Sequence, residues 1–206
     1  MYSIGRQSTG PLKTHVQQPD GAVTTLSDYS LTGAPAVLDK SGDATFAMGR
    51  WAGGTVNTPS SSGAIDGNNA WHYLLSNLPA VFPASANLTC DAGNFTSPTH
   101  VGGASNSGRG VGLASGSATL AFVDGKANAG ITVKVEAGST GSKTGAANGL
   151  AVGMTSIVGG SIGVGADAIY LTIGQAEADA FTVQGGYEIN LANGARYSGV
   201  YRFRCH

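Results

Sequence analysis

The last strand-like segment of the chain places the strongest limit on its fold. From Arg196 to Cys205 the sequence reads Arg-Tyr-Ser-Gly-Val-Tyr-Arg-Phe-Arg-Cys and alternates without a break. Successive side chains of a β-strand point to opposite faces, so the aromatic residues fall on one face and the arginines on the other. We therefore expect Tyr197, Tyr201 and Phe203 to be buried and to close a β-sandwich or barrel. The opposite face should be wet and basic.

Similar period-2 segments recur along the chain between turn residues. Ala118–Val123 and Gly130–Glu136 both alternate on either side of Asp124-Gly125, which indicates a hairpin with a longer or bulged loop. No segment shows the strand-helix alternation of a parallel α/β fold. We predict an all-β fold, an antiparallel barrel or sandwich of about 8–10 short strands, with under about 10% helix.

Turn residues are concentrated in the first 44 residues, where only Ala22–Leu26 is a clear strand candidate. We expect residues 1–44 to form an extended or edge-strand N-terminal segment and residues 45–206 to form an antiparallel β-barrel domain. Within the second part, residues 91–109 are expected to be a long loop, and Gly185-Gly186 a tight turn between two strands.

Composition favours an extracytoplasmic protein. Only 11% of the 206 residues are charged, 33 are glycine and the formal net charge is -1. This pattern is common in secreted or surface β proteins of bacteria and offers no general attraction to nucleic acid or to an anionic membrane. No apolar run approaches the roughly 20 residues that span a bilayer. We expect a secreted or outer-surface protein whose native signal sequence is absent from the sequence at hand, with no membrane span and no nucleic-acid partner.

The chain has two cysteines, Cys90 and Cys205. They are either two buried free thiols or one disulfide in an oxidising compartment. Each ends an alternating stretch, Ala86–Cys90 and the final strand, which favours the disulfide. In the chain-entropy model, closing so long a loop stabilises the fold by about 4 kcal/mol.

Candidate catalytic and metal-binding residues are few. Ser161 lies in a Gly-Gly-Ser-Ile-Gly segment that formally matches a nucleophile elbow, but no helical pattern follows it, so a serine hydrolase is a remote alternative. His15, His72 and His100 are widely separated and show no metal-ligand spacing. We expect no enzyme activity, no cofactor and no metal site.

Two sets of side chains are candidates for binding. The aromatic set either fills the core or forms a pocket for a flat or sugar-like ligand, and consists of Trp51, Trp71, Tyr73, Tyr170, Tyr197 and Tyr201. The basic set is either a solvated strand edge or a contact for the carboxylate or phosphate of a partner, and consists of Arg196, Arg202 and Arg204.

Three segments are similar to the C-terminal β module of the large FecR-domain surface proteins of Gram-negative bacteria. Phe46–Val56 resembles the module's Trp-Gly-Arg-Trp-x-Gly-Gly segment, and Asn69–Leu75 resembles its Asn-Gln-Gly-Leu-His-Tyr-Val-Val segment. Phe95–Thr99, followed by glycine-rich sequence and Ser117–Phe122, resembles a third run. The similarity covers roughly residues 46–135. Met48 stands where the family usually has tryptophan, and the two cysteines and the arginine-bearing final strand also depart from its pattern.

The resemblance implies a secreted or envelope-exposed antiparallel barrel like those of transferrin-binding lipoproteins, with no catalytic residues to carry over. It also favours a strand over a helix at residues 70–75, where Trp71, Leu74, Leu75 and Leu78 also fit a helical stripe. We expect a non-catalytic module with a structural, adhesive or assembly role, which binds a protein partner or itself at the cell surface. A lipocalin-like barrel that binds a small or haem-like ligand is the alternative.

Overall fold

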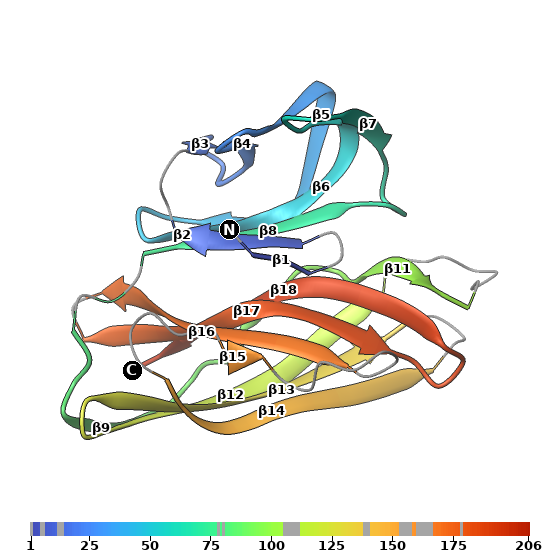
Figure 1. Ribbon diagram of the computed structural model, residues 1–206. Helices are drawn as coiled ribbons and strands as arrows, with labels where there is room; N and C mark the ends of the chain where they lie inside the picture. Colours follow the sequence, from blue (N-terminus) through green and yellow to red (C-terminus); the bar gives the residue numbers. More distant parts are fainter. Residues whose placement is uncertain are drawn as a thin grey trace.

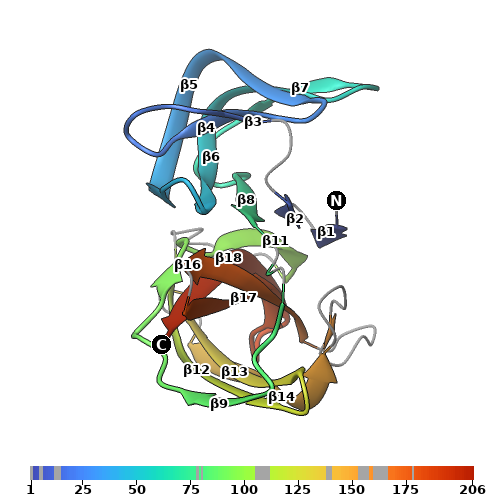
Figure 2. The same cartoon turned by 90° about the vertical axis from the view of Figure 1, so that its left-hand side faces the viewer.

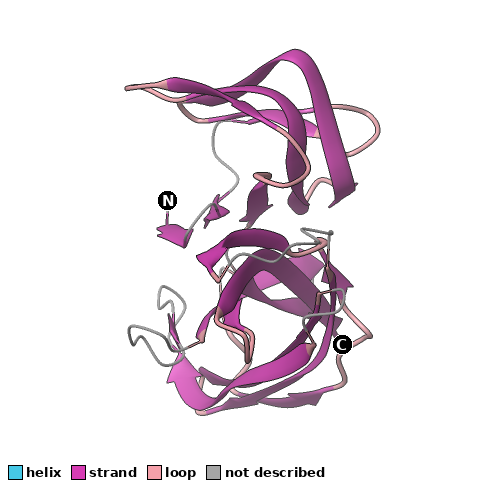
Figure 3. Cartoon of the chain, turned by 90° about the vertical axis from the view of Figure 1, so that its right-hand side faces the viewer, coloured by secondary structure: helices cyan, strands magenta, loops and turns pink. Residues whose placement is uncertain are grey.

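The computed structural model describes residues 2–4, 7–11, 15–77, 79, 81–104, 112–137, 141–152, 158–159, 167–177 and 179–206. These residues form eighteen strands in three sheets, and no helix occurs among them (Figure 3). All strand pairs are antiparallel except one. The prediction of an all-β, mainly antiparallel fold is confirmed. The strands outnumber the 8–10 expected because the first 44 residues and the expected loop at 91–109 contain several of them.

The first of the three sheets, called here the N-terminal sheet, uses strands from residues 2–76 in the order β1-β2-β8-β6-β5-β4-β3, with β7 on β6 (Figure 1). Its strands are β1 (Tyr2–Ile4), β2 (Gln7–Pro11), β3 (His15–Gln17), β4 (Val23–Leu26), β5 (Tyr29–Gly42), β6 (Phe46–Asn57), β7 (Ser62–Ile65) and β8 (Trp71–Ser76). The one parallel pair joins β2 to β8. Strands on both sides of residue 44 therefore share one sheet, while the division of the chain into two domains at that residue stays a prediction.

The other two sheets come from the rest of the chain. The β18 sheet has the order β10-β18-β17-β16-β15 with β11 also on β18, and the β13 sheet has the order β14-β13-β12-β9. The β18 sheet consists of β10 (Asn94–Phe95), β11 (Thr99–Gly103), β15 (Val158–Gly159), β16 (Ala168–Glu177), β17 (Ala180–Asn190) and β18 (Ala195–Cys205). The β13 sheet consists of β9 (Ser85–Leu88), β12 (Leu113–Val123), β13 (Lys126–Glu136) and β14 (Ser142–Val152).

The β18 sheet and the β13 sheet curve around a shared apolar core (Figure 2). Alternate residues of β12, β13, β16 and β18 point into it, as the period-2 patterns predicted. Phe82, Phe122 and Phe181 form one aromatic group in this core, with Phe122 and Phe181 4.7 Å apart between ring centroids. Tyr201 and Phe203 of β18 are fully buried in the same core. The predicted packed face of the final strand is therefore confirmed.

Residues 85–95 join the two sheets along one side. β9 pairs with β12, and the chain then leaves β12 to pair with the end of β18. At the crossing, Thr89 and His206 exchange two backbone hydrogen bonds, of 2.9 and 3.0 Å. The disulfide between Cys90 and Cys205 lies beside them. It ties the last strand to the strand before the expected loop, as predicted.

The N-terminal sheet covers the outer face of β17 and β18. Phe46, Met48 and Leu74 from the N-terminal sheet pack on Val200 of β18 in a small apolar cluster. The prediction that this face of β18 is wet is wrong for its middle, because Val200 and Arg202 are buried beneath the second layer. The alternation located the two faces correctly, but it carries no information on what covers the outer one.

Two expectations about turns are also wrong. The hairpin between β12 and β13 has a two-residue turn, with Asp124 at φ +51° and Gly125 at φ +70°, so the longer loop is not needed. Gly185 and Gly186 lie inside β17, opposite Tyr201 and Val200. In the expected loop, β10 and β11 pair with β18, and residues 105–109 lie outside the described residues.

Glycine inside the strands makes room for tyrosine on the neighbouring strand. Gly49 pairs with Tyr73, Gly199 with Tyr187 and Gly185 with Tyr201. A Cβ atom would lie 2.4 Å from the Tyr73 hydroxyl at Gly49 and 2.3 Å from the Tyr187 hydroxyl at Gly199. Each ring therefore lies across its glycine, and its hydroxyl reaches a backbone group beyond. The Tyr201 hydroxyl, for example, donates to the carbonyl of Tyr170 at 2.7 Å.

Candidate functional site

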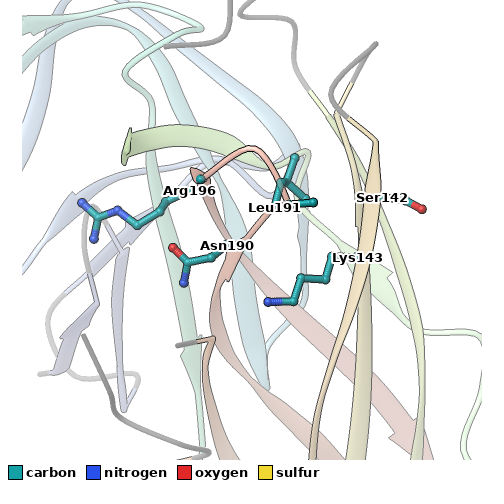
Figure 4. A pocket seen from close by; sticks show the side chains of 7 residues that line it. Ser142, Lys143, Asn190, Leu191 and Arg196 are labelled. Carbon is teal, nitrogen blue, oxygen red and sulfur yellow. The ribbon is translucent and has the colours of Figure 1, made fainter. Parts of the chain in front are cut away.

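An open cleft of about 670 Å³ lies where β17 turns into β18 (Figure 4). Its lining comes from the start of β14, the end of β17 and the start of β18 and comprises Ser142, Lys143, Asn190, Leu191, Ala192, Gly194 and Arg196. The turn is built by local hydrogen bonds: the Leu191 and Gly194 amides donate to the carbonyls of Ala195 and Leu191, each at 2.8 Å. Gly194 has φ +83°, a conformation that favours glycine. A regular turn thus holds the floor of the cleft.

Ion pairs hold the two cationic side chains of this cleft. Lys143 Nζ lies 2.9 Å from Asp167 Oδ1, which also accepts a hydrogen bond from the Asn190 amide at 2.9 Å. Arg196 Nη1 lies 3.0 Å from Glu188 Oε1. Both cations keep about two fifths of their side-chain surface exposed, 40% for Lys143 and 43% for Arg196. The four charges balance, so the cleft presents fixed, solvent-facing donors without a large net potential.

The two cations do not converge. In Figure 4 the ammonium of Lys143 reaches from β14 toward Asn190, whereas the guanidinium of Arg196 extends away from it on the far side of the turn. A small anion held by both side chains at once does not fit this arrangement. An extended surface with separate carboxylate or hydroxyl acceptors does.

The predicted aromatic set divides between two cores. Trp51 and Tyr73 are buried in the N-terminal sheet, where Trp51 Nε1 donates to the Val23 carbonyl at 2.6 Å. Burial raises the pKa of Tyr73 to about 12. Tyr197 and Tyr201 are buried in the core of the other two sheets, while Trp71 and Tyr170 are half-buried.

These side chains leave little space between them. The cavity that Trp51, Trp71 and Tyr73 border has a volume of about 10 Å³, room for about one water molecule. The six aromatic side chains therefore do not come together as one pocket.

The three arginines of the predicted basic set contact different partners. Arg196 pairs with Glu188, and Arg204 Nη2 lies 3.0 Å from Glu177 Oε2. Arg202 is only 6% exposed, and its guanidinium carbon lies 3.6 Å from the centroid of the Phe46 ring. Burial lowers the pKa of Arg202, an effect opposed by Asp43 and Asp91. Of the three, only Arg196 lines the cleft.

A buried polar junction joins the N-terminal sheet to the β18 sheet, and the sequence patterns did not reveal it. His72 of β8 is 1% exposed, with Nδ1 2.8 Å from the Thr96 hydroxyl and Nε2 2.9 Å from the Thr99 hydroxyl. Burial lowers the pKa of His72 to about 3, with nearby Arg50 as the second cause. The ring is thus neutral, with one nitrogen donating and the other accepting. It bridges the two layers.

Asp39 completes the junction. Arg50 Nε donates to Asp39 Oδ2 at 3.0 Å, and the Ser97 amide donates to the same oxygen at 2.8 Å. Asp39 has φ +51° and lies where β5 bulges between Leu38 and Ser41. The bulge re-aims one side chain, which is a common use of such irregularities. No period-2 pattern predicts it, because a bulge breaks the period.

The remaining candidate residues are Ser161, His15 and His100. Among the described residues, no group of three or more histidine, cysteine, aspartate or glutamate side chains is arranged to hold a metal ion. Ser161 lies outside the described residues. His100 packs edge-to-face against Tyr197, with ring centroids 5.5 Å apart, and His15 is half-buried on β3. In the described chain we find no helix with the length and apolar character needed to cross a membrane.

Comparisons with known proteins give no assignment. No protein-family model matches the chain, and searches of curated proteins and of solved structures find no significant match.

Proposed function

We propose that the chain is a non-catalytic, extracytoplasmic β module that binds a protein partner, or a second copy of itself, at the cell surface through the cleft at the β17–β18 turn. The observation that carries this proposal is the distribution of its side chains. The large aromatic residues are used in two packed cores, whereas Lys143 and Arg196 remain exposed around an open cleft. Cationic groups held in place on strands by ion pairs are suited to contact a partner.

The disulfide between Cys90 and Cys205 supports an extracytoplasmic location. Disulfides persist in oxidising compartments and are rare in the cytosol. Cys205 is fully buried, and the bond lies between strands that also exchange backbone hydrogen bonds. The location implied by the resemblance to FecR-domain modules agrees with this, and both remain proposals.

The lipocalin-like alternative lacks a specific observation in its favour. A pocket for a haem-like ligand needs several hundred Å³ of mostly apolar space. Within the described residues, the core between the β18 and β13 sheets is occupied by Phe82, Phe122, Phe181, Tyr201 and Phe203. Filling of this kind supports a structural or partner-binding module.

Two measurements on the protein from its natural host test the proposal. Protease treatment of intact cells should remove it, and native mass spectrometry should show an oxidised chain that carries a protein partner or a second copy. A protein that is shielded inside the cytosol with reduced thiols contradicts the proposed location. Co-purification of a small ligand in place of a protein would favour the lipocalin-like alternative.

Charge-neutral variants test the role of the cleft. The double variant Lys143→Gln and Arg196→Gln should lower partner binding at least tenfold, because each change removes an exposed positive charge, and with it charge-assisted hydrogen bonds, at the cleft. Lys126→Gln is the matched control, since Lys126 is exposed at the start of β13 and is not among the cleft residues. Equal binding by all of these variants would show that the cleft is not the contact surface.

A further inference from the structure

A second cleft, of about 250 Å³, lies beside Trp71 in the N-terminal sheet. Val56 of β6 and Ile65 of β7 give it an apolar floor, and Trp71 of β8 gives it an aromatic wall. Thr58, Ser61 and Asn69 form a polar rim. Among the described residues β7 pairs with no strand except β6, and its Ala64 carbonyl accepts a hydrogen bond from Asn69 Nδ2 at 3.4 Å.

Trp71 differs from the other tryptophan of the chain. Trp51 is 1% exposed and its indole N–H is hydrogen bonded, whereas Trp71 is half-buried, and no hydrogen bond of its indole N–H is found within the described residues. Tyr29 supports the Trp71 ring from the side, with ring centroids 6.1 Å apart. A half-buried tryptophan offers an apolar ring face together with an N–H donor at its edge.

The charge and size of the cleft restrict its ligand. None of the described residues that line it carries a charge, so neither an anion nor a cation finds a counter-ion there. Its volume is below the ~300–1,000 Å³ typical of pockets for drug-sized ligands, which excludes a haem-sized molecule. A single sugar ring combines an apolar C–H face with a rim of hydroxyl groups, and therefore matches an aromatic wall, an apolar floor and a hydroxyl-rich rim.

We propose that this cleft binds one ring of a neutral saccharide, stacked on Trp71. The proposal goes beyond the partner-binding role proposed above, because it assigns a glycan contact at a place separate from the cleft at the β17–β18 turn.

Tryptophan fluorescence offers a direct readout, since the chain contains only Trp51 and Trp71. Titration of the purified chain with methyl glycosides of glucose, galactose, mannose and N-acetylglucosamine should change the emission with at least one of them. The same sugar should protect the accessible tryptophan from acrylamide quenching. Trp51→Phe should keep the signal and Trp71→Phe should remove it.

Gly63 provides a variant that fills the cleft without disturbing the fold. It lines the cleft, and a Cβ atom there would meet nothing within 4 Å. Gly63 pairs with Val56 and lies two residues before Ile65, so its side chain would share the face of these two floor residues. We expect Gly63→Val to lower sugar affinity at least tenfold with little change in Tm.

Gly67→Ala is the matched control, because Gly67 is equally open but is not among the residues that line the cleft. It should leave sugar affinity unchanged. The absence of binding to any neutral glycoside at millimolar concentration overturns the proposal. So does binding that Gly63→Val and Trp71→Phe leave unaltered. Neither result affects the proposed partner-binding role, which is tested by protease shaving and by the Lys143 and Arg196 variants.

Discussion

Arg202 shows how the environment of one residue depends on a layer that is distant in the sequence. It occupies the outer face of β18, as alternation predicted, yet it is buried because Phe46 and the rest of the N-terminal sheet lie over it. Arg196, on the same face of the same strand, lies at the open end and keeps 43% of its side chain exposed. Two arginines six positions apart on one strand should therefore contribute differently to the free energy of unfolding.

We expect Arg202→Ala to lower the free energy of unfolding by roughly 2 kcal/mol, through loss of the cation–π contact and of the packing of its aliphatic stem. Arg196→Ala should cost under about 1 kcal/mol, the usual range for an exposed ion pair. Urea unfolding at neutral pH measures both. Equal costs for the two variants would contradict the burial of Arg202 beneath the N-terminal sheet.

His72 predicts a pH dependence of stability. Its pKa is about 3 in the folded protein against 6.5 ordinarily, so below pH 6.5 the unfolded chain binds a proton that the folded chain does not. Stability should therefore fall as the pH is lowered from about 6.5 toward 3, by up to about 1.4 kcal/mol per pH unit. Urea midpoints at pH 7, 6 and 5 test this, in a range where ordinary carboxyl groups stay ionised.

His72→Gln is the control for this pH dependence. Glutamine retains a donor and an acceptor but does not titrate, so the slope between pH 7 and 5 should flatten. A slope equal to that of the unaltered protein would place its origin elsewhere. The junction formed by His72, Thr96 and Thr99 was not predictable from the sequence, because its members belong to segments whose contact depends on the docking of two sheets.

At the scale of single strands, glycine marks crowded positions as well as turns. Gly185 and Gly199 lie within β17 and β18, and each faces a tyrosine ring on its neighbour. A Cβ atom at Gly185 would lie 1.8 Å from the carbonyl oxygen of Tyr170, which is backbone and cannot move freely. The pair Gly185-Gly186 was therefore mistaken for a turn because a glycine that makes room and a glycine that turns the chain look alike in sequence.

We expect Gly185→Ala and Gly199→Ala each to lower stability by about 1–3 kcal/mol, the usual cost of overpacking. Gly63→Ala, with open space around its Cβ, should change stability by less than about 1 kcal/mol. Thermal unfolding of the three variants measures the difference. Equal stability of the three variants would contradict the crowding by the Tyr170 carbonyl at Gly185 and by the Tyr187 ring at Gly199.

Strands such as β12, β13 and β18 were predictable because their alternation reports burial on one side. The turn at Asp124-Gly125 was located correctly, since the dipeptide favours the left-handed conformations that a tight hairpin requires. The bulge at Asp39 was not, because an extra residue shifts the period that the prediction depends on. Loop composition was also misleading at 91–109, where two strands as short as β10 and β11 pair with β18.

At the scale of the molecule, the disulfide between Cys90 and Cys205 should be formed in every native chain. Thiol titration of the unfolded, unreduced chain should find no free thiol. Cys90→Ala with Cys205→Ala should lower the free energy of unfolding by roughly 4 kcal/mol, since the bond closes a loop between positions 115 residues apart. Two titratable thiols, or an unchanged midpoint in the double variant, would contradict this.

The arrangement of layers was the least predictable part. The disulfide pairing followed from two cysteines at strand ends, and the packed aromatic face of β18 from its period. The docking of the N-terminal sheet on β17 and β18 produces no comparable sequence pattern. Its apolar contacts involve only a few residues, such as Met48, Leu74 and Val200. The candidate clefts depend on how strands and turns come together in the folded chain. The sequence patterns therefore pointed to only some of their residues, among them Trp71 and Arg196.

The bond between Cys90 and Cys205 also determines how the chain carries tension. A pull applied between the N-terminal sheet and His206 passes from Cys205 directly to Cys90, and residues 91–204 are excluded from the loaded path. Single-molecule stretching of the oxidised protein should therefore release at most about 3.6 Å for each of the residues up to Cys90. Addition of a reductant should more than double that length. A module at a cell surface would in this way yield in its N-terminal sheet and at β9, while residues 91–204, which the disulfide encloses, carry no load.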